Sequence, residues 1–273
     1  MTSLWSAQRE YVPVKRWSAR SPVAGGWAFA NTKAVSLDGV NEYMTAAGGD
    51  VLGVAAADRR TWAFWIKIGS GSLYPTIWSK GSRAAGNKNE SYIAMDATAH
   101  KLYLLLGYNG LQFYVHVTSD IALTLDTFEY WTITKNNTDL ASGIKIYKSG
   151  SIVTTTTGSD TFSGYECSNV QTMRVACDFV DGVNAYFLPG SLNDFTMFNT
   201  DLTAAEVSEL YNGGTSFDAR THTKAANLMA YWVMGDYTGD STAAGGRIYD
   251  VLGNANNDLL PTNMEAADIV AYP

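Results

Sequence analysis

Short stretches in which apolar and polar residues alternate dominate the middle of the chain. In residues 111–118, Phe113, Val115 and Val117 fall on one face of an extended segment, and polar or amphipathic side chains fall on the other. Similar patterns occupy residues 62–68, 101–106, 130–135, 144–147, 151–156, 170–177, 186–188 and 192–198. Glycine, asparagine, aspartate and serine separate these segments. Many short strands with hairpin-length gaps predict an all-β sandwich of two antiparallel sheets.

One gap between two predicted strands has the signature of a tight hairpin. Residues 148–151 place Gly150 where a two-residue turn favours a positive φ. This turn fixes the register of the two strands that it joins.

A single helix is also indicated after the last of these strands. Thr203 can cap it, and Glu206, three residues later, can complete a capping box. Leu202 and Val207 are spaced to form a hydrophobic staple, and Gly213 is expected to end the helix. A helix of about two turns must pack on the sandwich, because it is too short to persist alone.

The first 34 residues differ from the rest, since they sustain neither alternation nor a helical period. They combine aromatic and basic side chains, and disordered segments are poor in aromatics, so we expect this arm to dock on its own sandwich or on a neighbouring subunit. The residues predicted to dock are Trp5, Arg9, Tyr11, Lys15, Arg16, Trp17 and Arg20.

Charge divides the chain in the same way. Lysine and arginine total 19 against 26 acidic residues, for a net charge of −7. Residues 1–33 contain five basic residues and one acidic residue, so the arm carries +4 and the remainder −11. An acidic body argues against general nucleic-acid binding.

The apolar runs and the cysteines bear on membrane insertion, secretion and disulfide formation. No run approaches the roughly 18 residues that span a bilayer, so no membrane integration is predicted. The N-terminus lacks the apolar stretch of about 7–15 residues of a secretory signal, so no conventional export is expected. Cys167 and Cys177 allow either a hairpin disulfide or two buried thiols.

The sequence contains no recognisable catalytic constellation. His100, His116 and His222 lack metal-type spacing, and the chain has no nucleophile elbow, phosphate loop or dinucleotide turn. Sandwich-type glycoside hydrolases need two carboxylates about 5–9 Å apart, and no predicted strand carries such an alternate pair. We therefore predict that the protein is not an enzyme.

An ordered set of motifs carries a family resemblance. Its members are residues 35–44, 61–67, 77–81, 131–134, 144–150, 189–199 and 202–207. Together they make residues 35–214 resemble the laminin-G-like, concanavalin A-like jelly-roll family. The resemblance implies a jelly-roll sandwich of two antiparallel sheets with one short helix, in a family whose members mostly bind rather than catalyse.

The same resemblance implies one metal site. Calcium often sits at one rim in this family, and Asp38 and Asp194 match the positions of its carboxylate ligands. Asn193 stands where the family has a second aspartate, and calcium needs six to eight oxygens. The alternatives are thus a calcium ion or no cofactor, with both carboxylates serving as turn and strand-end hydrogen-bond acceptors.

Residues 215–273 are predicted to form a C-terminal extension packed on the sandwich. Within it, residues 227–236 and 248–258 resemble segments that commonly precede the family's core. A permuted order is tolerable because sandwich termini lie at the surface. Comparable C-terminal segments occur in laminin-G-like proteins of bacteriophage particles.

Two functions follow from these observations. The first is a non-catalytic virion structural protein, a capsid-decorating or tail-associated homo-oligomer made in the host cytoplasm. Its arm would bind capsid or tail proteins, and its sandwich could bind host-surface glycans. The alternative is an extracellular carbohydrate-binding module or lectin. Candidate glycan contacts on or beside strands are Tyr74, Trp78, Tyr92, Tyr108 and Tyr114.

Overall fold

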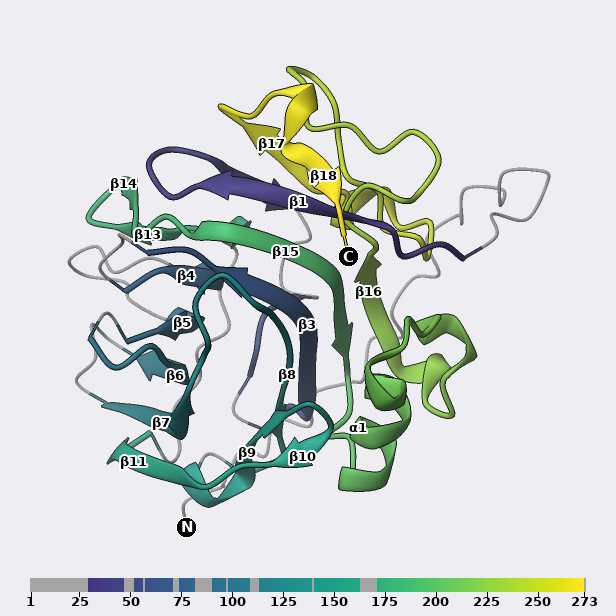
Figure 1. Cartoon of the computed structure of the whole chain (residues 1–273). Coiled ribbons are helices and arrows are strands. Elements are labelled where there is room, and N and C mark those ends of the chain that lie inside the picture. The colour runs from purple at the N-terminus through teal and green to yellow at the C-terminus, as the bar shows by residue number, and fades with distance from the viewer. Residues whose placement is uncertain are drawn as a thin grey trace, which may run out of the picture.

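Two eight-stranded antiparallel sheets stack on each other, and one short helix packs beside them (Figure 1). The computed structural model describes residues 29–46, 52–55, 57–70, 74–81, 90–96, 98–108, 113–138, 140–162 and 171–272. This architecture confirms the predicted all-β jelly-roll class with one short helix. No helix in these ranges is long and apolar enough to cross a membrane.

The first sheet, sheet A, contains the strands that carry the helix on their outer face. In spatial order they are β10 (Ser151–Ile152), β9 (Ile144–Lys148), β8 (Phe128–Lys135), β3 (Arg60–Ile68), β15 (Pro189–Phe198), β1 (Lys33–Asp38) and β18 (Ile269–Ala271), with β16 (Leu228–Trp232) also paired to β15.

The second sheet, sheet B, lies against the inner face of sheet A. Its order is β11 (Thr155–Asp160), β7 (Phe113–Ala122), β6 (Lys101–Tyr108), β5 (Glu90–Met95), β4 (Thr76–Gly81), β12 (Met173–Val175), β2 (Tyr43–Ala46) and β17 (Leu260–Thr262). A separate hairpin joins β13 (Asp178–Val180) to β14 (Val183–Ala185).

Large aromatic side chains fill the space between the sheets. The indoles of Trp62 and Trp78 pack 5.3 Å apart, and Phe64 meets Phe195 edge-to-face at 5.5 Å. All four side chains have no exposed surface. Their burial supplies much of the hydrophobic stabilisation that holds the two sheets together.

The predicted helix is α1 (Ala204–Tyr211), and its capping box is confirmed. Thr203 N–H donates to Glu206 Oε2 at 2.7 Å, and Glu206 N–H donates to Thr203 Oγ1 at 3.4 Å. The helix ends one residue earlier than predicted, because Asn212 already adopts the left-handed conformation at φ 49°. Val207 and Leu210 are buried against the outer face of sheet A.

The predicted hairpin turn is present between β9 and β10. Ser149 and Gly150 both have positive φ, at 49° and 75°, as a type I′ turn requires. A Cβ on Gly150 would lie 3.0 Å from the ring of Tyr211 in α1. The glycine therefore serves both the turn and the seating of the helix.

Two predicted strands differ from the structure. Residues 186–188 form no strand, because Tyr186 adopts a left-handed backbone at φ 55°. Residues 151–156 are divided: β10 pairs with β9 in sheet A, whereas β11 pairs with β7 in sheet B. The chain therefore crosses from one sheet to the other between Ile152 and Thr155.

The segment predicted as a C-terminal extension adds strands to both sheets. β16 and β18 join sheet A through β15 and β1, and β17 joins sheet B through β2 (Figure 1, yellow and olive). Asp236 ties this region to the start of β1, since its Oδ2 accepts N–H bonds from Thr32 at 2.7 Å and Lys33 at 2.9 Å. Short 3-10 turns lie at Ala141–Gly143, Asn212–Gly214, Ala219–Thr221, Ala225–Asn227, Ala255–Asn257 and Ala266–Asp268.

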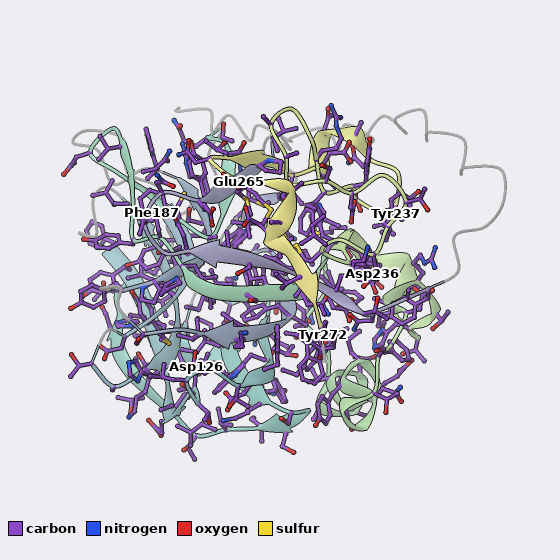
Figure 2. All side chains as sticks on the ribbon, turned by 45° about the horizontal axis from the view of Figure 1, so that its top comes forward. Asp126, Phe187, Asp236, Tyr237, Glu265 and Tyr272 are labelled. Atoms are coloured by element: carbon purple, nitrogen blue, oxygen red, sulfur yellow. The ribbon has the colours of Figure 1, made fainter. Side chains whose placement is uncertain are left out.

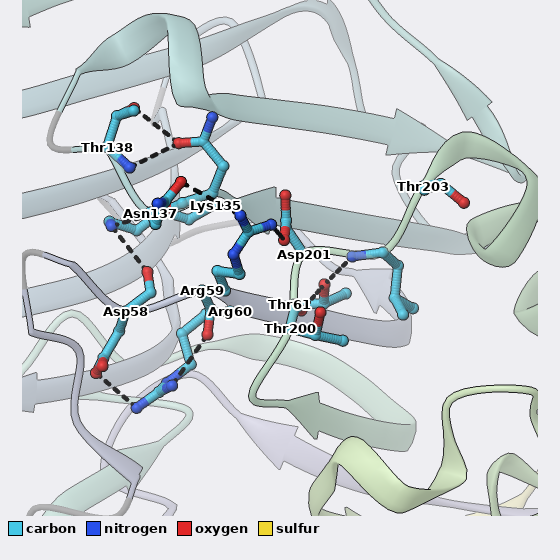
Figure 3. A network of polar contacts seen from close by, with 12 residues as sticks. Asp58, Arg59, Arg60, Thr61, Lys135, Asn137, Thr138, Thr200, Asp201 and Thr203 are labelled. Carbon is cyan, nitrogen blue, oxygen red and sulfur yellow. Dashed lines mark hydrogen bonds and ion pairs between the residues drawn. The ribbon is translucent and has the colours of Figure 1, made fainter.

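A polar network joins β3 and β8 to the segment before α1 (Figure 3). Arg59 pairs with Asp201 at 2.5 Å, and Arg60 pairs with Asp58 at 2.8 Å. The buried ammonium of Lys135 donates to the carbonyl of Asp58 at 3.0 Å. Each charge is therefore paired or hydrogen-bonded, and the buried side chains of Arg60 and Lys135 require such partners.

The two cysteines and the arm are only partly within the described ranges. Cys177 is a buried free thiol, and Cys167 lies outside the described residues. All seven predicted docking residues of the arm also lie outside them.

Candidate functional site

Alternate side chains along the strands of sheet B point away from the core and form the outer face of this sheet. Leu104, Leu106, Val115 and Val117 point into the core, so their neighbours on β6 and β7 point outward. Strand register then brings the outward residues side by side: Tyr92 pairs with Leu105, Leu105 with His116, and Tyr103 with Thr118. Residues far apart in the sequence thus form one continuous surface across β5, β6 and β7.

This surface contains a cavity of about 250 Å³. Its lining consists of Tyr74, Tyr92, Asp96, Ala99, Lys101, Tyr103, Leu105, His116 and Thr118. The strands β5, β6 and β7 supply Tyr92, Lys101, Tyr103, Leu105, His116 and Thr118. The turn between β5 and β6 supplies Asp96 and Ala99, and the segment before β4 supplies Tyr74. The cavity thus combines ring faces with hydrogen-bonding groups.

Ring contacts fix the aromatic part of the lining. Tyr103 meets Tyr92 edge-to-face with ring centroids 5.8 Å apart, and it meets the ring of His116 at 4.8 Å. Tyr92 and Tyr103 are both buried, so their rings are held in place by their surroundings. They form a rigid wall rather than a flexible one.

His116 is a neutral hydrogen-bonding group in this setting. Burial lowers its pKa, while the charge of Asp96 acts in the opposite direction. Its Nε2 lies 3.1 Å from Thr118 Oγ1. A Cβ at Gly158 of β11 would lie 2.7 Å from its Nδ1, so the glycine allows the imidazole to pack against the neighbouring strand.

Asp96 and Lys101 bring opposite charges to the cavity. Asp96 Oδ1 accepts N–H bonds from Thr98 at 2.9 Å and Ala99 at 2.6 Å, which shapes the turn after β5. Asp120 lies on the neighbouring β7, and its pKa is lowered by a hydrogen bond from Thr156 and by the charge of Lys101. The ammonium of Lys101 therefore lines the cavity and also acts on a carboxylate of the next strand.

Tyr74 is the exposed aromatic of the lining. Its side chain is 45% exposed, and its backbone has a φ of 55°. It meets Tyr186, which also has a φ of 55°, edge-to-face at 6.1 Å. Bulky residues rarely adopt this conformation, and such strain often accompanies ligand clamps.

The five aromatic residues predicted to contact glycans differ in their position relative to the cavity. Tyr74 and Tyr92 line the cavity, and Tyr114 packs beside it on the same face. Trp78 requires a correction, because it has no exposed surface and packs against Trp62 in the core. The side chain of Tyr108 lies outside those described.

Seven cavity residues were not among the predicted contacts: Asp96, Ala99, Lys101, Tyr103, Leu105, His116 and Thr118. The alternation of residues 111–118 placed His116 opposite the apolar face, and Tyr103 lies in the strand predicted at residues 101–106. Their approach to Tyr92 depends on strand register, which the sequence alone does not reveal.

Asp38 and Asp194 are not brought together. Asp38 pairs with Pro189 on the β1–β15 ladder, and Asp194 lies five residues further along β15. At about 3.3 Å per residue, roughly 16 Å separates them, too far for one ion. The prediction of a site shared by these two carboxylates is therefore wrong.

Asp38 serves as a turn acceptor in the structure. Its Oδ1 accepts N–H bonds from Val40 at 2.8 Å, Asn41 at 3.1 Å and Glu42 at 3.2 Å. Partial burial acts to raise its pKa, but these bonds outweigh it and the pKa is lowered.

Asp194 sits in a buried, left-handed position at φ 53°. Burial raises its pKa to about 7, against the effect of a hydrogen bond from Tyr231. Its Oδ1 has no hydrogen-bond partner. Within the described ranges no three His, Cys, Asp or Glu side chains converge as metal ligands, and calcium binding stays a prediction.

Comparison with known protein families assigns the chain to a superfamily. The model of the Laminin_G_3 family, described as the concanavalin A-like lectin/glucanases superfamily, matches residues 38–208. This chain belongs to that superfamily. Its membership confirms the fold and family expected from the sequence. No curated protein matches this lectin/glucanase-type chain significantly.

Solved structures share the lectin/glucanase fold at low sequence identity. A candidate carbohydrate binding protein from Bacteroides ovatus has 15% identity and a TM-score of 0.58, covering 89% of this chain and 60% of its own. The CBM40 of Ruminococcus gnavus IT-sialidase, bound to α2,3-sialyllactose, has 13% identity and a TM-score of 0.51, covering 65% and 95%. At these identities the similarity shows the fold alone.

Proposed function

We propose that this chain is a non-catalytic carbohydrate-binding module that holds a sugar in the cavity on the outer face of sheet B. One observation carries the proposal: the exposed ring of Tyr74 shares a cavity with the polar groups of Asp96, Lys101 and His116. A sugar needs this combination, since its C–H face stacks on aromatic rings while its hydroxyls need hydrogen-bond partners.

The fold relatives support a glycan ligand. The chain belongs to a superfamily of lectins and glucanases, and one structure with the same fold is a module bound to sialyllactose. Hydrolysis of a glycoside by the usual route requires two carboxyl groups flanking the bond. Among the described residues lining the cavity, Asp96 is the one carboxylate, which favours binding over catalysis.

A glycan array followed by titration tests this function. Tyr74→Ala should weaken binding of the best array ligand by about tenfold, the loss expected for one stacked ring. Tyr74→Phe keeps the ring and should bind within about twofold of wild type.

Tyr272→Ala is the matched control for that experiment. Tyr272 (Figure 2) is a half-buried aromatic that meets Trp65 and Phe128 over sheet A, away from the cavity. Its removal should leave affinity unchanged. Absence of binding to every glycan, or equal affinity of Tyr74→Ala and wild type, would contradict the proposal.

We also propose that this module belongs to a virion, as a capsid-decorating or tail-associated homo-oligomer. The support is the sequence itself: a basic, aromatic arm on an acidic body, and C-terminal segments that resemble those of phage proteins. The structure sets how much of the arm can be deleted without disturbing the sandwich. Phe29 packs against the hydrophobic cluster on the outer face of sheet A, and the N–H of Thr32 donates to Asp236 Oδ2. Deletion should therefore stop at residue 28. Loss of particle association is the expected result, and association at normal occupancy would contradict this role.

A further inference from the structure

The charges at the cavity set which sugars can enter. Asp96 lines it, and Asp120 on β7 accepts a hydrogen bond from Thr156, which is the β11 partner of the lining residue Thr118. Against these two carboxylates stands the single ammonium of Lys101, whose charge also acts on Asp120. His116 adds no positive charge near neutral pH, because burial lowers its pKa. The described charged groups at this surface thus sum to a negative value.

The size of the cavity limits its occupant. Its volume of about 250 Å³ lies below the roughly 300–1,000 Å³ typical of pockets for drug-sized ligands. One sugar ring fits such a space better than a chain of rings. The exposed ring of Tyr74 offers apolar surface for a ring's C–H face, and the almost fully buried rings of Tyr92 and Tyr103 also line the cavity.

We infer that this cavity takes a single neutral hexose ring and discriminates against sugars that carry a carboxylate. The inference rests on the proposed function and names its ligand class. A neutral hexose can donate hydroxyl hydrogen bonds to Asp96 and accept one from Lys101. A uronate or sialic acid instead brings a negative charge toward Asp96 and Asp120, and the charge of Lys101 already acts on Asp120.

Matched pairs of monosaccharides test this inference on the whole chain. Methyl β-D-glucoside and methyl β-D-glucuronide differ only in the oxidation state of C6, and the corresponding galactose pair repeats the comparison. The measurement is a chemical-shift titration of the ¹⁵N-labelled protein. The neutral member should bind about fivefold more tightly at low salt, as expected for like charges about 4 Å apart in water. High salt should shrink this ratio.

Asp96→Asn isolates the carboxylate proposed to repel acidic sugars. Asparagine keeps an acceptor oxygen for the N–H groups of Thr98 and Ala99, so the turn should survive. The neutral-to-acidic ratio should fall by about half or more in this variant. Asp126→Asn is the control, because it removes the same charge from an exposed turn before β8 of sheet A.

The possible outcomes distinguish failure of this inference from failure of the proposed carbohydrate-binding function. If glucuronide or galacturonide binds more tightly than its neutral partner at the cavity, the ligand class is wrong and carbohydrate binding stands. An unchanged ratio in Asp96→Asn also overturns the inference. If no sugar of either charge shifts the cavity residues, the proposed function itself fails.

Discussion

At the residue scale, the buried carboxyl of Asp194 makes stability depend on pH. Its folded-state pKa of about 7 exceeds the usual value near 4, so the folded protein holds this proton more tightly than the unfolded chain. The free energy of unfolding should therefore fall as pH rises from about 4 to 7, by up to about 1.4 kcal/mol per pH unit.

Asp194→Asn should remove the contribution of Asp194 to this dependence and stabilise the protein at pH 8. The contributions of Asp240 and Asp250, whose pKa values burial also raises to about 7, should remain. Asparagine fits the site because it tolerates the left-handed backbone at φ 53° and leaves no charge to bury. Urea unfolding of both proteins at pH 5 and pH 8 measures the effect. A variant that is less stable than wild type at pH 8 would show that the ionised carboxylate is stabilising.

Trp78 distinguishes a core residue from a sugar contact. Trp78→Phe removes part of a side chain with no exposed surface that packs on Trp62. The free energy of unfolding should fall by about 1–3 kcal/mol, while sugar affinity stays unchanged. Denaturant unfolding and sugar titration of the same sample check both statements; lost affinity in a stably folded variant would contradict the assignment.

At the scale of elements, the sequence was sufficient to predict those features whose interacting residues are close together in the chain. The capping box of Thr203 and Glu206 and the turn at Gly150 formed as predicted, because each needs only a few consecutive residues. Trp78 shows the limit of such reasoning. Residues 77–81 were recognised as a family motif, but the irregular pairing of β4 with β5 decides which face the indole of Trp78 occupies.

A substitution at Gly150 tests whether the turn between β9 and β10 and the helix α1 depend on each other. Gly150→Ala must tolerate φ 75° and a Cβ 3.0 Å from the ring of Tyr211, so it should destabilise the protein by about 1–3 kcal/mol. In a Tyr211→Ala background the cost should be smaller, since only the backbone strain remains. A double-mutant cycle by chemical denaturation measures this coupling. Simple additivity would mean that the turn and α1 are independent.

At the scale of the whole molecule, the C-terminal segment is part of the sandwich. Removing residues 269–273 deletes β18 and uncovers the edge of β1, whereas the cavity lies across β5, β6 and β7 of the other sheet. The thermal midpoint should fall by roughly 2–4 °C for each kcal/mol lost, with sugar affinity retained. Thermal scans and titration test this separation; an unchanged midpoint would show that β18 is dispensable.

Whole-molecule organisation was predictable only in outline. Alternation and turn residues led to the sandwich, and ordered motifs led to the family. The sequence could not show that residues 215–273 supply strands to both sheets, because pairing over such separations leaves no local pattern. For the same reason, it gave two of the cavity aromatics but not their neighbours Tyr103 and His116.

The most direct test of the central claim is a chemical-shift map of the ¹⁵N-labelled chain, titrated with the best glycan-array ligand. Binding at the outer face of sheet B should shift the amides around Tyr92, Tyr103 and His116. Shifts confined to the aromatic surface of sheet A around Trp65 and Tyr272, with the cavity residues unmoved, would contradict it.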